Sequence, residues 1–510
     1  MRNAGEKTTV AIIGAGLAGS EAAWQLAQRA VNVRLYEMRP RYQTPAHQGE
    51  ACAELVCSNS LKSLLLPSAA ATLKHELASL GSFVMRVALK HRLPAGQALA
   101  VDRQKFAAEI SCELNQHPRI QVIHKQIQAV DEVLANNQEQ IIIATGPLTA
   151  KALACNIATT LGSEHLAFYD AAAPIVEADS LDHSQLFAQS RYNKAGADYL
   201  NAALDKELYE QLVIELCQAQ RVVRRSFERH ELFVACQPVE EVARTGPESL
   251  RHGALKPFGL CAPDCVKPPY AVVQLRAENP AKTAYNLVGF QTNLTFGEQQ
   301  RIFRLIPGLA QARFSRLGVM HRNTFINAPH ALGSTLELPA NPRIRFAGQL
   351  TGTEGYTEAI ASGLFAALNC YARILDVPPV HLPAHSCFGA LLAYATNPDT
   401  RDYQPMHVNY GIMEPLASPP RQKRQRYAAY SLRALQALAN FKAVRSELNF
   451  APSYLVPDLA TTAVCSFESS PENSRVALEA VREPEISLPP DVRAQPRERL
   501  SASSEGRGGE

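Results

Sequence analysis

The sequence predicts an α/β protein in which a Rossmann-like nucleotide-binding domain of the glutathione-reductase type is interrupted by an inserted α+β domain. Three observations carry this prediction. A strand, a glycine turn and a helix follow one another near the N-terminus, the composition changes between about 165 and 310, and a second strand–glycine–helix element spans 343–375. Strands that alternate with helices are typical of a parallel sheet covered by helices. A length of 510 residues favours two or more domains.

The first element spans residues 9–37. Its apolar, β-branched start is typical of a buried parallel strand, the residues after the turn have helical character over 21–29, and a second strand over 31–36 ends at Glu37. The turn has the G-x-G-x-x-G pattern, which permits close approach of a pyrophosphate to the free N–H groups of a helix start. An acidic residue about 20 positions later binds a ribose hydroxyl. The expected nucleotide-binding residues are Gly14, Ala15, Gly16, Leu17, Ala18, Gly19 and Glu37.

Two later turns favour FAD over NAD(P) as the tightly held nucleotide. A buried strand at 140–143 runs into the turn Ala144-Thr145-Gly146-Pro147, a sequence that recurs in FAD-dependent proteins with two dinucleotide folds. A strand over 344–347 is followed by a turn that starts at Gly348 and by an alanine-rich helix over 358–375. In FAD proteins such an element binds the ribityl chain and the pyrophosphate. We therefore add Thr145, Gly146, Gly348, Gly352 and Gly355 to the expected cofactor-binding residues.

Between these elements, residues 41–63 form a polar segment that we expect to run past the cofactor as an extended or turn-rich loop leading into a helix. It carries Cys57 among several other polar side chains. Further along, Asp102 is expected to cap the start of a helix.

The composition of residues 165–310 is richer in aromatic and basic side chains, and strands outnumber helices there. The stretches 271–277 and 286–294 are interpreted as a strand pair, and an arginine-rich segment precedes Cys236. The tail from about 468 is rich in Pro, Ser, Glu, Arg and Gly without periodicity, a composition typical of disorder. The predicted organisation is a first FAD-domain part over 1–165, an insert over 166–310, a second FAD-domain part with C-terminal helices over 311–445, and an extension over 446–510.

Charge and cysteine content narrow the functional classes. Because the net charge is only +3, any site for a polyanion must be a local patch. One candidate is the basic helix near Arg421–Arg426, whose charges fit contact with RNA and an ordinary solvent-exposed helix face equally well. The polar start MRNAGEKTTV is no signal peptide, and no stretch is apolar enough to span a bilayer, so we expect a cytoplasmic protein without membrane contact. The 11 scattered cysteines argue against a disulfide framework and lack the spacing of a metal site.

Several stretches over about residues 8–440 have characteristic sequences. They are GAGLAGSEAAWQLA, RLYEMRP, QTPAH, AELVCSNSLKS, LPAGQALAVDR, ATGPLT, FYDAAAPIVE, SRYNK, KPFGL, PYAVVQLR, YNLVGFQTNLTFGEQ, RLIPGL, GVMHRNTFIN and GTEGYTEAIASG. In these stretches the chain resembles the folate- and FAD-dependent tRNA (uracil-5-)-methyltransferases, a bacterial flavoprotein family. It departs from that family at His407, where an Asn is usual, and in the tail beyond about 445.

The resemblance implies an activity. A methylene group from methylenetetrahydrofolate would be placed on C5 of the T-loop uridine of tRNA and reduced to a methyl group by FADH2, which NADPH or NADH would replenish. The same motifs would serve an enzyme acting on a ribosomal-RNA uridine. A related flavoprotein that modifies the wobble uridine with a GTPase partner shares the fold, but its members are longer. The alternative from another class is a non-catalytic flavin- or RNA-binding protein. No protein partner is inferred.

Two cysteines fit the chemistry of uracil C5. This carbon is a poor nucleophile until a thiolate adds at C6. Cys236 follows basic residues, which favour a thiolate, and Cys57 lies in the loop expected beside the cofactor. The resemblance singles out the same pair. We favour Cys236 as the nucleophile and Cys57 as a base or assisting thiol, with the reverse order left open.

Weaker sequence signals predict further contacts with the substrates. Tyr356 is interpreted either as a ring that stacks on folate or as a core residue, and the triplet His321, Arg322 and Asn323 as a group that orients folate or uracil. Arg224 and Arg225 are expected to contact RNA phosphates.

Overall fold

The computed structural model describes residues 8–44, 46–134, 139–162, 166–171, 173–193, 198–222, 237–261, 268–318, 320–400 and 403–456. The tail for which disorder was predicted lies outside the described residues.

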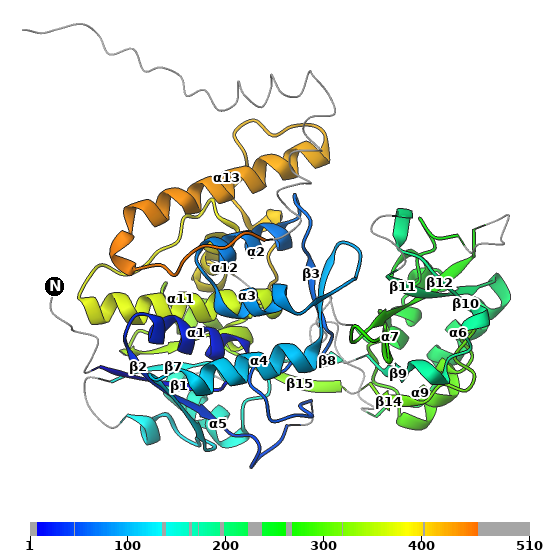
Figure 1. Ribbon diagram of the computed structural model, residues 1–510, viewed down its shortest axis with the longest axis horizontal. Helices are drawn as coiled ribbons and strands as arrows, with labels where there is room; N and C mark the ends of the chain where they lie inside the picture. The colour runs from blue at the N-terminus through cyan, green and yellow to red at the C-terminus, as the bar shows by residue number, and fades with distance from the viewer. Residues whose placement is uncertain are drawn as a thin grey trace, which may run out of the picture. The chain divides into compact units, whose positions relative to one another are not determined.

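A six-stranded sheet forms the centre of the nucleotide-binding part (Figure 1). Its order is β16-β17-β7-β1-β2-β6, and all neighbouring strands are parallel except the edge strand β16. The central strand β1 is almost wholly buried, as its apolar sequence predicts. This confirms the predicted parallel sheet of an FAD-binding, Rossmann-like fold. The strands are β1 (Thr9–Ile13), β2 (Asn32–Glu37), β6 (Ile120–His124), β7 (Gln140–Ile143), β16 (Glu337–Leu338) and β17 (Asn341–Phe346).

Helices α1 (Leu17–Gln28) and α11 (Tyr356–Leu375) lie side by side in this part (Figure 1). They pack so closely that a Cβ at Gly363 would overlap the carbonyl of Ala18. Both helices begin earlier than predicted, α1 directly after Gly16 and α11 directly after Gly355, because the glycines themselves are the capping residues. The other helices here are α2 (Ala69–Ser79), α3 (Phe83–Lys90), α4 (Arg103–Gln116), α5 (Lys151–Leu161), α10 (Ala328–Ala331), α12 (Cys387–Thr396) and α13 (Lys423–Val444).

Two buried carboxylates fix helix starts in this part. Glu21 accepts the N–H groups of Phe83 and Val84 at 3.1 and 2.8 Å, at the start of α3. Glu76 accepts those of Cys387 and Phe388, both at 2.8 Å, at the start of α12. Burial raises the pKa of Glu76 to about 8 and also raises the pKa of Glu21. These contacts bind α1 to α3 and α2 to α12.

The second large sheet is antiparallel, with the order β10-β11-β12-β13-β9-β14. The predicted strand pair is present, since β12 pairs with β13, but β13 ends at Leu287 and not at 294. The N–H of Phe290 bonds back to the carbonyl of Leu287 at 3.4 Å, which closes a turn there. The strands are β9 (Ile175–Glu177), β10 (Leu186–Ala188), β11 (Tyr199–Leu204), β12 (Ala271–Ala277), β13 (Ala284–Leu287) and β14 (Phe314–Arg316), and the helices are α6 (Lys206–Gln218), α7 (Val239–Arg244), α8 (Ser249–His252) and α9 (Phe296–Phe303).

The remaining described strands form two small antiparallel sheets. One pairs β8 (Leu166–Ala171) with β15 (Met320–Phe325), and the other contains β3 (Ser60–Ser63), β5 (Ala98–Val101) and β4 (Arg92–Leu93). The last residues of segment 41–63, for which an extended or turn-rich loop is expected, are extended and pair with β5 as strand β3. Short 3-10 turns lie at Val130–Val133, Ala178–Ser180, His183–Gln185, Arg191–Asn193, Gly348–Thr351, Tyr410–Ile412 and Ser446–Leu448.

Within the described ranges, no helix combines the length and the apolar character needed to cross a bilayer. Nor does that part of the chain contain a group of three or more His, Cys, Asp or Glu side chains able to hold a metal ion.

Candidate functional site

A cavity of about 360 Å³ lies where the carboxyl ends of β1, β2 and β7 meet. Open α/β sheets bind ligands at this edge of the sheet, where the strand order reverses. The cavity is bordered by segments far apart in the sequence, among them the glycine turn, the loop after β2, the turn after β7 and the start of α11. The predicted site residues that line it are Gly14, Gly16, Leu17, Ala18, Glu37, Cys57, Thr145, Gly146, Asn323, Gly348, Gly355 and Tyr356.

The first two glycines of the turn have different roles. Gly14 has a φ of +101°, and a Cβ there would lie 2.5 Å from the carbonyl oxygen of Ala144, so the fold itself requires glycine. Gly16 has an ordinary φ of −71°, and a Cβ there would meet no atom within 4 Å. Because Gly16 also lines the cavity, the open space at its Cα is where a pyrophosphate can approach the helix start.

Three predicted cofactor residues are described but do not border the cavity. The N–H of Ala15 donates to Glu37 Oε2 at 3.0 Å, and Gly19 packs against the carbonyl of Gly14. Gly352 lies against the Tyr403 ring. These residues therefore shape the turns around the cavity.

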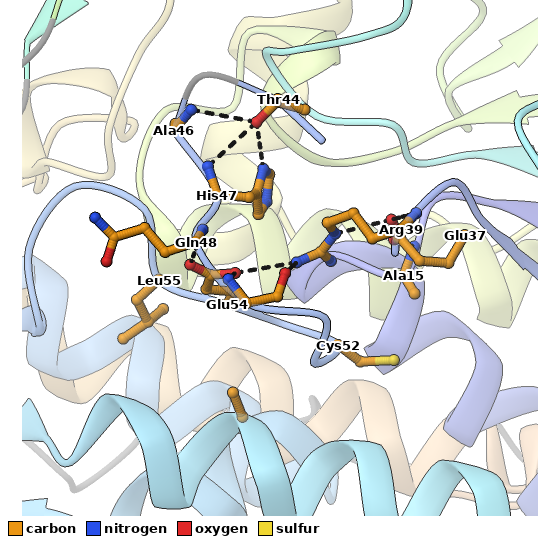
Figure 2. Close-up of polar contacts among 12 residues, drawn as sticks. Ala15, Glu37, Arg39, Thr44, Ala46, His47, Gln48, Cys52, Glu54 and Leu55 are labelled. Atoms are coloured by element: carbon orange, nitrogen blue, oxygen red, sulfur yellow. Dashed lines mark hydrogen bonds and ion pairs between the residues drawn. The ribbon is translucent and has the colours of Figure 1, made fainter. Parts of the chain in front are cut away.

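An ion-pair network joins the end of β2 to the following loop (Figure 2). The buried Arg39 lies 2.9 Å from Glu37 Oε1 and 3.1 Å from Glu54 Oε2. Glu54 also accepts the N–H groups of Gln48 and Gly49 at 2.8 and 3.0 Å. Burial alone would raise the pKa of Glu37, but the hydrogen bonds and charge of Arg39 keep it below the ordinary value. Glu37 thus faces the cavity as a carboxylate, and its partner Arg39 fixes the loop.

His47 lines the cavity from this loop, and its Nδ1 lies 2.6 Å from Thr44 Oγ1 (Figure 2). Burial, followed by the charge of Arg39, lowers the pKa of His47 to about 4. The imidazole is therefore neutral at physiological pH.

The Cys57 backbone is held by Tyr356 at the start of α11. The Tyr356 hydroxyl accepts the N–H groups of Cys57 and Ser58 at 2.8 and 3.2 Å. Burial, together with the neighbouring Cys57, raises the pKa of Tyr356 well above its usual range, so the phenol stays protonated. Its hydroxyl thereby fixes a residue that lies 299 positions away in the chain.

Three arginines also contact the same loop. Arg103 donates to the carbonyls of Leu55 and Cys57 at 2.8 and 3.3 Å and pairs with Glu278 at 2.6 Å. Two further contacts join the loop to β12 and β14, since Arg276 donates to Asn59 Oδ1 at 2.7 Å and Arg316 to the Val56 carbonyl at 2.5 Å. Sequence reasoning missed all three. The only signal was that Arg103 directly follows the helix cap Asp102, and its partner Glu278 lies 175 residues further on.

His407, the departure from the family pattern, lies near a second ion pair at the cavity. Lys62 Nζ and Glu358 Oε1 are 3.3 Å apart, and the same carboxylate oxygen accepts the N–H of Val408 at 3.1 Å. Burial, followed by the charge of Lys62, lowers the pKa of His407. A neutral imidazole there adds no charge to the site.

Several predicted residues lie elsewhere. Cys236, Arg224 and Arg225 lie outside the described residues. His321 and Arg322 belong to strand β15, as does the buried Asn323 that lines the cavity. Arg221, which the sequence placed in the same basic segment, pairs with Glu241 at 2.6 Å.

We expect Arg103→Gln to destabilise the protein by about 3 kcal/mol, because it leaves the Glu278 carboxylate buried without its cation and frees two carbonyls. The shift of the urea unfolding midpoint measures the loss. The double variant Arg103→Gln with Glu278→Gln should recover part of it. Arg86→Gln, which breaks the exposed pair with Glu113, is the matched control and should cost less than about 1 kcal/mol. An equal loss in the single and double variants would show that the ion pair is not responsible.

Comparisons with known proteins show which proteins this chain is similar to. Residues 9–378 match the family described as glucose inhibited division protein A. A relative from Moorella thermoacetica is 49% identical over 84% of this chain and 97% of its own, and one from Desulfitobacterium hafniense is 48% identical over 86% and 99%. Both are named methylenetetrahydrofolate--tRNA-(uracil-5-)-methyltransferase TrmFO.

The solved structure of GidA from Aquifex aeolicus is similar with a TM-score of 0.63 and 14% identity, over 94% of this chain and 76% of its own. A likeness at this identity shows the fold alone.

Proposed function

We propose, from the premise that this chain belongs to the glucose inhibited division protein A family and within it to the TrmFO methyltransferases, that it methylates C5 of a uridine in tRNA with methylenetetrahydrofolate as carbon donor. The finer parts of the proposal are that the target is the T-loop uridine and that NADPH or NADH is the reductant. The observation that carries the proposal is that Cys57 borders the same cavity as Gly16 and Glu37, which brings a thiol to the cavity that we propose for the dinucleotide.

The cavity fits FAD. The open backbone at Gly16, the start of α1 and the Glu37 carboxylate suit a pyrophosphate and a ribose, and Thr145, Gly146, Gly348 and Gly355 border the remainder. When bound, FAD would supply the reducing equivalents that turn the methylene group into methyl, with NADPH or NADH as their source.

We propose that the two cysteines act on uracil in different steps, one as the nucleophile and the other as the base. A thiolate, which we assign to Cys236, adds to C6 and raises the electron density at C5, which can then attack the methylene carbon. The C5 proton must next leave to a base, and we assign this step to Cys57, whose backbone Tyr356 and Arg103 hold. Loss of that proton expels the folate nitrogen from the methylene carbon and leaves an exocyclic methylene group on C5. Addition of a hydride equivalent to that carbon would convert it to methyl, expel the Cys236 thiolate from C6 and restore the C5–C6 double bond.

The remaining predicted residues bind substrates. Asn323, buried at the cavity, is proposed to orient folate or uracil together with His321 and Arg322. Arg224, Arg225 and the basic start of α13 near Arg421–Arg426 are proposed to contact tRNA phosphates. We place the enzyme in the cytoplasm, where tRNA is available.

Transfer of label from methylenetetrahydrofolate to an unmodified tRNA transcript tests the function. We expect yellow protein and incorporation that depends on added NADPH or NADH. A transcript with cytidine in place of the T-loop uridine is the control and should take up no label. Labelling of ribosomal RNA in place of tRNA would contradict the proposed substrate, and colourless protein without transfer would contradict the enzyme as a whole.

A further inference from the structure

Two aromatic rings stand exposed on neighbouring loops of the second sheet. Tyr192 lies in the turn Arg191–Asn193 and is 64% exposed, and Phe258, in the loop before β12, is 57% exposed. The proposed function gives neither ring a role. Isolated exposed apolar residues need no explanation, but two on loops that are bonded together indicate a binding surface.

The backbone around both rings is firmly held. Arg191 Nη1 donates to the carbonyls of Lys256 and Phe258 at 2.7 and 2.9 Å, and the Tyr192 N–H donates to the carbonyl of Gly259 at 2.8 Å. Leu260 anchors the second loop in a small buried apolar cluster. Exposure of the rings is therefore not a consequence of a loose loop.

The position of the Tyr192 ring is itself built into the fold. Tyr192 has φ 60° and ψ 25°, a left-handed conformation that side chains other than glycine rarely adopt and that concentrates at functional positions. A Cβ at Gly259 would lie 2.8 Å from the ring, so glycine is required for the ring to lie where it does. The ring is thus preorganised although solvent surrounds most of it.

The charges around the rings favour a nucleic acid. Lys256 Nζ lies 5.1 Å from the centre of the Phe258 ring and is exposed. The stretches 188–193 and 254–261 contain Arg191 and Lys256 but no Asp or Glu. Aromatic faces next to a cation suit unpaired nucleotides, whose bases stack and whose phosphates meet the ammonium group.

One strand joins this surface to the loop of Cys57. Gln274 and Arg276 are two residues apart on β12, so both side chains point to the same face, with about 7 Å between their Cα atoms. Gln274 Oε1 accepts Arg191 Nε at 3.0 Å, and Arg276 donates to Asn59, two residues after Cys57. The loop that carries Tyr192 and the loop that carries Cys57 are therefore both bound by side chains on one face of β12.

We propose that Tyr192 and Phe258 form a stacking platform for unpaired nucleotides of the RNA substrate, beside the loop that carries Cys57. This inference rests on the proposed function and adds a surface to it. The platform would hold nucleotides that have left their stack near the target uridine.

The test measures binding of an unmodified tRNA transcript by fluorescence anisotropy at several salt concentrations. Tyr192→Asn removes the ring with a residue that tolerates the left-handed backbone, and Phe258→Ser removes the other. We expect the Kd to rise about tenfold for each variant and about a hundredfold for the pair, with unchanged flavin content. Phe296→Ser, which removes a 54% exposed ring from α9, is the matched control and should leave the Kd unchanged.

Salt dependence separates stacking from charge. Stacking of a base on an uncharged ring releases no counterions from the RNA. The slope of log Kd against log salt should therefore stay the same in the ring variants, whereas Lys256→Ala should reduce it by about one. The conservative variants Tyr192→Phe and Phe258→Tyr should keep wild-type affinity, which guards against a general loss of structure.

Wild-type affinity in the double variant would overturn the platform and leave the methyltransferase proposal intact. Absence of tRNA binding by the wild-type protein would instead overturn the proposed function. Intact tRNA affinity with loss of self-association in the double variant would assign the rings to a protein contact and refute the RNA platform.

Discussion

Gly16→Val should yield a folded, colourless protein. The backbone at Gly16 is in the extended region that valine accepts, and an added Cβ would meet no protein atom within 4 Å, so we expect the fold to accept the side chain. That same space lies in the cavity, where the side chain would block the approach of a pyrophosphate to the start of α1. Loss of the flavin absorbance of the purified protein measures the effect, together with loss of the thermal stabilisation that a bound cofactor provides.

The chain offers a matched control at Gly297, in α9, where an added Cβ would likewise meet nothing within 4 Å. Gly297→Val should keep its flavin. In contrast to both of these variants, Gly14→Ala should not accumulate as soluble protein, because its Cβ would collide with the Ala144 carbonyl. A normal flavin spectrum in Gly16→Val would refute the assignment of the turn.

Cys57→Ser and Cys236→Ser should both retain FAD and lose methylation by several orders of magnitude, but for different reasons. Without the nucleophile, uracil C5 is not activated, and without the base its proton does not leave. A tRNA with 5-fluorouridine at the target position separates the two roles, because fluorine cannot leave as a proton and the adduct with the attacking thiol accumulates. We expect Cys236→Ser to fail to form this adduct and Cys57→Ser to form it.

Gel shift under denaturing conditions and mass spectrometry of the adduct identify the attached cysteine. Cys112→Ser, at an exposed cysteine of α4, is the control and should methylate normally. If Cys57→Ser alone abolished the adduct, the two roles would be reversed. Normal methylation by both variants would exclude thiol catalysis here.

The sequence by itself determined the parallel sheet and its nucleotide turn. The apolar run of β1, the spacing of Gly14, Gly16 and Gly19, and the acid at Glu37 depend on short-range rules of periodicity and backbone conformation, which operate within about 30 residues. For the same reason Asp102 was identified as a helix cap, and its side chain does accept the Lys105 N–H. Helix starts were less accurate, because Gly16 and Gly355 offer no side-chain cap for a pattern to detect.

Only the tertiary structure decided how the Cys57 loop is held. From its position after Gly355, Tyr356 is expected either to stack on folate or to lie in the core, and only the structure shows that its hydroxyl accepts an N–H of the loop backbone. Arg103 meets Glu278, and Arg276 meets Asn59, across large separations in the chain. The loops that carry the exposed rings of Tyr192 and Phe258 are joined in the same way, through Arg191. Such contacts depend on which strands pair and which faces meet, and no local rule of spacing or propensity contains that information.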